Sequence, residues 1–167
     1  MPEEQHLTQW VPRLRRYARA LARNRDDADD LVQDTLERAW SKAGLWRGVA
    51  DMCPWLLSIM HNLHVDGIRR ARLPTVELDD QTPEMAVAAT QGDRLAVRDL
   101  QTALDLLPLE QKQVLLLVAL EDMAYADVAQ TLGIPVGTVM SRLSRGRGRL
   151  RELMQGRNEP QHLKVVR

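Results

Sequence analysis

The chain has 167 residues, 44% hydrophobic and 28% charged, which is the composition of a globular protein with one ordinary domain or two small helical ones. A single cysteine, Cys53, excludes an internal disulfide and fits a reducing compartment. No apolar run approaches the roughly 18 residues that a membrane span needs. Met1–Trp10 lacks the apolar core of a signal peptide. We therefore expect a cytoplasmic protein without membrane insertion.

The charges cancel overall but are unevenly distributed along the chain. Lys and Arg number 23, as do Asp and Glu. Leu73–Asp93 contains acidic residues and no Lys or Arg, whereas Arg142–Arg151 contains five arginines and no acid. Such segregation is expected when one face meets phosphate and another stretch stays in solvent.

Apolar residues spaced by three and four predict helices over Leu7–Arg23, Asp26–Trp40 and Trp55–Arg72. The first helix is expected to turn Arg13 and its neighbouring arginines outward. The aspartates that begin the second helix suit an N-terminus through capping and the macrodipole. Between the second and third helices, Ala43–Pro54 predicts a loop that holds Cys53 as a half-exposed thiol.

Further along, the acidic stretch contains Pro74 and Pro83 and shows weak periodicity, which predicts a flexible linker. Four more helices are predicted, over Leu95–Leu107, Leu109–Leu120, Ala124–Leu132 and Val136–Met154. The expected fold is therefore all-α, with two small helical domains joined by a flexible linker. The predicted boundaries are 1–72 for the first domain, 73–94 for the linker, 95–155 for a four-helix domain with a helix-turn-helix, and 156–167 for a polar tail.

The segment Ala124–Leu150 has the pattern of a helix-turn-helix. Gly133 suits the left-handed backbone of a sharp turn, and Pro135 presets the first turn of the next helix. That second helix would expose polar and basic side chains that fit the DNA major groove. The pattern alone also allows a plain helical hairpin in a bundle, but a run of five arginines does not suit a buried helix.

The sequence AYADVAQTLGIPVGTVMSRLSRGRGRLREL, residues 124–153, resembles the C-terminal domain of extracytoplasmic-function (ECF) sigma factors of the sigma-70 family. The sequence DADDLVQDTLERAW, residues 27–40, is similar to the family's polymerase-binding helix. WLLSIMHNLHVDGIRR, residues 55–70, is similar to its promoter-melting helix. The resemblance covers roughly Leu7–Leu153, in order and with sensible spacing.

The resemblance implies an initiation factor whose partners are core RNA polymerase (the β′ clamp helices and β flap), promoter DNA and an anti-sigma factor. The implied polymerase-binding residues are Asp30, Leu31, Gln33, Asp34 and Glu37. The implied −10 contacts are Trp46, His61, Asn62, Arg69 and Arg70. The implied −35 contacts are Thr138, Ser141, Arg142, Arg145, Arg147 and Arg149.

Several features of these sets have plainer explanations. The aspartates at the start of the second helix would also serve as caps, and Trp46 would also serve as a core aromatic. His61 and His64 are three residues apart, but no further ligand completes a metal site, so neither a metal nor a cofactor is expected. The family usually has a basic residue where Met140 stands and a better helix former at Gly146 and Gly148, so we expect an altered −35 preference and a less rigid helix.

No catalytic constellation stands at a usable spacing, so an enzyme is not expected. Two other classes remain as alternatives. A stand-alone helix-turn-helix regulator would explain the C-terminal half but not the two N-terminal helices. A sigma-like mimic that sequesters an anti-sigma factor would be expected to lose the basic recognition helix, which this chain retains.

Overall fold

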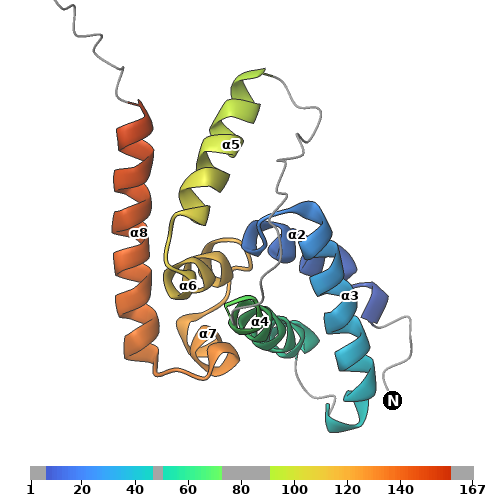
Figure 1. Ribbon diagram of the computed structural model, residues 1–167. Coiled ribbons are helices and arrows are strands. Elements are labelled where there is room, and N and C mark those ends of the chain that lie inside the picture. The colour runs from blue at the N-terminus through green and yellow to red at the C-terminus, as the bar shows by residue number, and fades with distance from the viewer. Residues whose placement is uncertain (1–6, 47–50, 73–90, 159–167) are drawn as a thin grey trace, which may run out of the picture.

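The structure is a computed structural model that describes residues 7–46, 51–72 and 91–158. Helices make up its regular structure, and no strand occurs in these ranges (Figure 1), which confirms the all-α prediction. The first half contains α2 (Val11–Leu21), α3 (Arg25–Ser41), the short 3₁₀ helix η1 (Ala43–Leu45) and α4 (Met52–Ala71). The second half contains α5 (Gln91–Asp105), α6 (Leu109–Ala119), α7 (Tyr125–Leu132) and α8 (Val136–Asn158).

Most of the predicted linker, 73–90, lies outside the described residues, as does the end of the predicted tail. Helix α5 begins at Gln91, slightly before the predicted end of the linker, and α8 continues to Asn158, past the predicted start of the tail. The domain boundaries themselves stay a prediction.

The first half is a bundle in which α3 packs between α2 and α4. Its centre is formed by fully buried side chains from α2 and α4, among them Leu14, Tyr17, Leu56 and Met60. Helix α3 begins at a side-chain cap, because the Asn24 side chain accepts a hydrogen bond from the backbone N–H of Asp27 at 2.8 Å. The predicted aspartates therefore occupy the first turn, where they complement the macrodipole, and the cap itself is the asparagine before them.

Helix α6 lies at the centre of the second half, which explains why its C-terminal part, residues 114–119, is apolar on every side. Val114, Leu115, Leu116 and Leu117 are all buried. The helix packs against α8 and α7 on its own side and against α2 of the first half. A helix that is apolar all round is expected where neighbours cover it on several sides.

The two halves pack directly against each other. Helix α2 contacts α6 and α4 contacts α7, while α8 stands on the side away from the first half (Figure 1). Buried apolar residues of both halves belong to one continuous cluster, from Leu14 and Leu56 to Leu117 and Val139. The two halves are thus held together by a core that they share, in addition to the core inside each half.

The structure corrects three expectations about individual residues. Cys53 lies in the first turn of α4 and not in a loop, because Asp51 caps the helix by accepting from the Cys53 N–H at 3.1 Å. Its side chain is 1% exposed, and burial raises the pKa of the thiol to about 11. Trp40, one of the apolar residues whose spacing predicts the helix Asp26–Trp40 and would place it inward, is 51% exposed. Arg13, expected to point outward, is one-third exposed and contacts the second half.

None of the described helices combines the length and apolar character that a bilayer crossing demands.

Candidate nucleic-acid and polymerase interfaces

Helices α7 and α8 form the predicted helix-turn-helix. Gly133 ends α7 in the left-handed conformation, with φ 67° and ψ 37°. The N–H of Ile134 then donates to the carbonyl of Ala129 at 3.0 Å, which closes the turn. The Pro135 carbonyl accepts from the N–H groups of Thr138 and Val139 at 3.0 and 3.1 Å and so starts α8. The segment is therefore a helix-turn-helix, as the sequence predicts.

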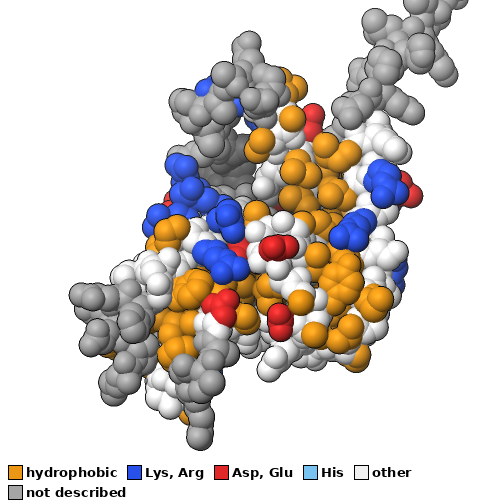
Figure 2. All heavy atoms as spheres, turned by 180° about the vertical axis from the view of Figure 1, so that it is seen from behind, with side chains coloured by type: hydrophobic (Ala, Val, Ile, Leu, Met, Phe, Trp, Pro, Cys, Tyr) orange, Lys and Arg blue, Asp and Glu red, His pale blue; other side chains and the backbone are white. Residues whose placement is uncertain are grey.

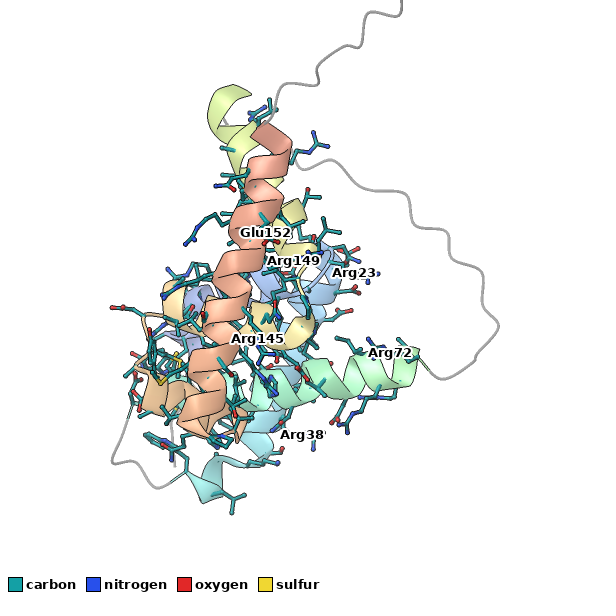
Figure 3. All side chains as sticks on the ribbon, turned by 90° about the vertical axis from the view of Figure 1, so that its left-hand side faces the viewer. Arg23, Arg38, Arg72, Arg145, Arg149 and Glu152 are labelled. Carbon is teal, nitrogen blue, oxygen red and sulfur yellow. The ribbon has the colours of Figure 1, made fainter. Side chains whose placement is uncertain are left out.

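The exposed side of α8 carries most of the predicted −35 residues. Ser141, Arg145, Arg147 and Arg149 are exposed, and Thr138 is half-buried. The Arg145 Nε donates to the Ser141 carbonyl at 3.3 Å, which lays its side chain along the helix. Arg145, Arg149 and Glu152 follow one another up α8 (Figure 3), and Arg149 lies 3.8 Å from the Glu152 carboxylate.

Arg142 differs from the other arginines of α8 because it points toward the rest of the protein. Its side chain is 24% exposed and lies 3.7 Å from the Glu110 carboxylate at the start of α6. Its positive charge also acts on His61 of α4. A residue predicted to read −35 and one predicted to read −10 are therefore neighbours in this arrangement.

The predicted −10 residues of α4 divide into an exposed and a half-buried group. Asn62, Arg69 and Arg70 are exposed, and α4 runs away from α8 toward Arg72 at its far end (Figure 3). His61 is half-buried, and its Nδ1 has no hydrogen-bond partner. Burial, and then the charge of Arg142, lower the pKa of His61. The exposed group is free to meet DNA, whereas His61 faces the second half.

Trp46 is half-buried and packs against the hydrophobic core. It is therefore partly a core aromatic. The predicted role of this tryptophan in capturing a base stays a prediction.

The predicted polymerase-binding residues lie on α3. Asp30, Gln33, Asp34 and Glu37 are exposed, and the Gln33 side-chain amide donates to Glu37 at 3.2 Å. Leu31 is only 9% exposed because its side chain packs into the core, and its part in polymerase binding stays a prediction.

The prediction missed Trp40, which lies one turn beyond Glu37. Its exposed ring borders a shallow apolar groove between the start of the described chain and α3, lined by Leu7, Thr8, Val11, Leu36, Glu37 and Trp40. The sequence carried no signal for it, because the apolar spacing that predicts the helix Asp26–Trp40 includes Trp40 among the inward residues. An acidic row beside an exposed aromatic suits a protein partner.

Elsewhere the surface charge is mixed. On the back face, basic side chains lie in separate groups among acidic ones and apolar patches, and they do not form a continuous basic field (Figure 2). Within the described ranges, no three His, Cys, Asp or Glu side chains come together as a metal site.

A basic helix-turn-helix packed on a second helical bundle defines a DNA-binding regulator of transcription. Two family models match in chain order, the Sigma2 domain of PhyR over residues 7–61 and sigma-70 region 4 over residues 98–150. The chain is 34% identical over 145 residues to the ECF RNA polymerase sigma factor EcfG of Rhodopseudomonas palustris, covering 86% of this chain and 80% of the relative. It is 39% identical over 142 residues to SigM of Mycobacterium tuberculosis, covering 84% and 71%. The chain belongs to the ECF sigma factors.

Solved structures agree with this assignment. The sigma factor RpoE of Bartonella quintana, in complex with the anti-sigma factor NepR, superposes with a TM-score of 0.73 at 30% identity, covering 91% of this chain and 96% of that one. CnrH in complex with the cytosolic domain of CnrY gives a TM-score of 0.69 at 25% identity, covering 92% and 90%. The PhyR chain in its complex with NepR from Sphingomonas shares the fold, with a TM-score of 0.68 at 20% identity.

Proposed function

We propose that this sigma factor binds core RNA polymerase and directs initiation at specific promoters, with the first half reading the −10 element and the second half the −35 element. The observation that carries the proposal is that one chain presents two exposed polar and basic helix surfaces, on α4 and on α8. Asn62 offers a donor and an acceptor to a base edge, and Arg145 and Arg147 offer charge to bases or phosphates. Phosphate contacts supply affinity and base contacts supply specificity.

Polymerase binding is assigned to α3 and the groove beside it. The acidic row Asp30, Asp34 and Glu37 would steer the helix toward a basic partner such as the β′ clamp helices, and the Trp40 ring would supply apolar contact area. The second half would meet the β flap, as the family resemblance implies.

An anti-sigma factor is proposed as the second protein partner. The similar sigma factor RpoE was solved with the anti-sigma factor NepR, and the similar CnrH was solved with CnrY. This chain would be regulated in the same way, by a partner that covers its polymerase-binding or DNA-binding surfaces.

The alternative of a sigma-like mimic has one supporting observation, since PhyR shares the fold and was solved with NepR. The basic face of α8 opposes that alternative, because a mimic that never meets DNA has no use for exposed arginines at three positions of a recognition helix. A stand-alone helix-turn-helix regulator is opposed by the extent of the sigma-factor match, which covers both halves.

Run-off transcription with core polymerase and a pool of genomic promoter fragments tests the proposal. Specific transcripts are expected with the wild-type protein and should be lost with Asn62→Ala and with Arg142→Ala. Glu110→Gln is the matched control, because it breaks the same ion pair as Arg142→Ala while keeping the arginine. Arg23→Ala controls for loss of a positive charge elsewhere. Absence of transcripts and of binding to core polymerase would move the assignment to the mimic or the stand-alone regulator.

A further inference from the structure

Glu121 joins the two halves of the protein through a buried carboxylate. It lies in the turn between α6 and α7, yet its side chain is 0% exposed and is held by two arginines of α2. The Arg13 Nε donates to one carboxylate oxygen, and the Arg13 Nη2 donates to the Glu121 carbonyl at 3.1 Å. Arg16 donates to the other carboxylate oxygen at 3.3 Å and to the Leu120 carbonyl at 3.2 Å. We call Arg13, Arg16 and Glu121 the latch.

The turn that carries Glu121 is shaped for this contact. The next residue, Asp122, has φ 51° and is the one non-glycine residue with positive φ in the described ranges. Aspartate is among the residues that adopt this conformation most readily. The Met123 N–H donates back to the Leu117 carbonyl at 3.1 Å, which closes the turn around Glu121. Burial, and then the charge of the Glu121 carboxylate, raise the pKa of Tyr17 in the core of the first half.

A second contact holds the other end of α2. Lys112 of α6 is buried, and its Nζ donates to the Leu21 carbonyl at the end of α2 at 3.0 Å. The same amine lies 2.9 Å from the Asp105 carboxylate, so its charge is compensated within the second half. Helix α2 is thus fixed to the second half at both ends, and α4 packs on α7 alongside.

This closed arrangement conflicts with reading a promoter. The −10 and −35 elements are about 25 base pairs apart, which is roughly 85 Å of duplex at about 3.4 Å per base pair. Here the two DNA-reading halves are in direct contact, and His61 of α4 feels the charge of Arg142 of α8. Both elements cannot be bound at once until the halves separate.

We propose that the latch holds the free protein in a closed form that cannot read a promoter, and that core polymerase must break it. The inference rests on the proposed function, because it assumes that the two halves read separate elements. Removing one partner of a buried ion pair leaves a buried charge without compensation, which is strongly destabilising, so a broken latch should favour separation of the two halves. The apparent association constant for core polymerase is then that of the open form multiplied by the fraction of molecules that are open. A small open fraction therefore weakens binding.

Two substitutions break the latch from opposite sides. Glu121→Gln keeps the shape of the side chain and removes its charge. Arg13→Lys keeps the charge, but a single ammonium replaces the fork that reaches both the carboxylate and the carbonyl. Glu152→Gln is the matched control, because it removes a carboxylate that pairs with Arg149 on the surface of α8, away from the latch. Circular dichroism of each full-length variant verifies that its helices are intact.

The experiment measures the radius of gyration by small-angle X-ray scattering and the binding to purified core polymerase by titration. Both latch variants should expand relative to the wild type and bind core polymerase about tenfold or more tightly, whereas Glu152→Gln should match the wild type on both counts. A change that merely damaged the fold would weaken binding, so tighter binding is specific to an opened latch.

Unchanged dimensions in both latch variants would overturn the closed form, and expansion without tighter polymerase binding would overturn its role as a brake. Failure of the proposed function looks different, because the wild type and every variant would then fail to bind core polymerase whatever their dimensions.

Discussion

Gly146 of α8 lies against Gln111 of α6, so that a Cβ built on the glycine would stand 3.3 Å from the Gln111 Cβ and 3.4 Å from the Gln111 carbonyl oxygen. Helix α8 crosses α6 at this point, and the missing side chain lets the two backbones approach. Gly148, two residues further on, has nothing within 4 Å of its Cβ position. The two glycines that the sequence presents as equivalent therefore have different roles.

We expect Gly148→Ala to stabilise the protein by about 1 kcal/mol, because alanine is the better helix former at an open helical position. Gly146→Ala gains the same propensity but must displace the Gln111 backbone, so its net effect is smaller or destabilising. Urea unfolding of both variants measures the free energy of unfolding. Equal stabilisation by the two substitutions would show that α8 does not approach α6 closely at Gly146.

Gly133 presents the opposite case, in which space is available but the backbone is restrictive. No atom lies within 4 Å of its Cβ position, yet its φ of 67° disfavours any residue with a side chain. Gly133→Ala should lower the free energy of unfolding by about 1 kcal/mol, and Gly133→Asn should lower it less, because asparagine tolerates the left-handed region. Gly137→Ala, at an open position inside α8, is the control that should not destabilise. If alanine and asparagine cost the same, backbone strain is not the cause.

The elements that short-range patterns determine were predictable from the sequence. The spacing of apolar residues predicts the helices, and Gly133 with Pro135 predicts the turn, because these signals lie within a few residues of the feature they specify. The same spacing places Leu31 in the core, and its assignment to the polymerase surface came from the family resemblance alone.

The closure of the two halves was not predictable in this way. Arg13 lies on the polar side of α2 and points away from the core of its own half. In an isolated bundle, a side chain in this position would be exposed to solvent. Glu121 sits in a turn, where a charged residue is normally exposed. The Glu121 carboxylate is buried and Arg13 is only one-third exposed because each half supplies the partner of the other, and the two residues are 108 positions apart in the chain.

His64 should make the stability of the protein depend on pH. Burial first, and then the charges of Lys112 and His61, lower the pKa of His64 from 6.5 to about 4, against an opposing effect of Asp27. Above pH 6.5 the imidazole is neutral in both folded and unfolded chains and contributes nothing. Between pH 6.5 and about 4 the unfolded chain takes up the proton first, so the folded state loses stability as the pH falls.

His64→Gln removes this titration. The free energy of unfolding should therefore fall less steeply between pH 6.5 and 4.5 in the variant than in the wild type, and both should show the same slope from pH 7 to 8. Chemical unfolding at intervals across this range gives the two curves. Parallel curves throughout would mean that His64 is accessible to protons in the folded protein.

Trp40 provides the sharpest test of the polymerase surface because it is exposed and lies beside the acidic row of α3. About half of the Trp40 side chain is packed against the fold, so Trp40→Ala should lower the free energy of unfolding by about 1 kcal/mol and leave the protein folded. Binding to core polymerase should weaken by roughly tenfold or more, which is the loss expected for an aromatic anchor at an interface.

Leu45→Ala, a substitution at another exposed apolar residue, is the control and should leave binding unchanged. Titration of labelled protein with core polymerase measures both variants. A Trp40 variant that binds as tightly as the wild type would place the polymerase contact on another face of α3, whereas one that unfolds would show that the ring supports the groove and not a partner.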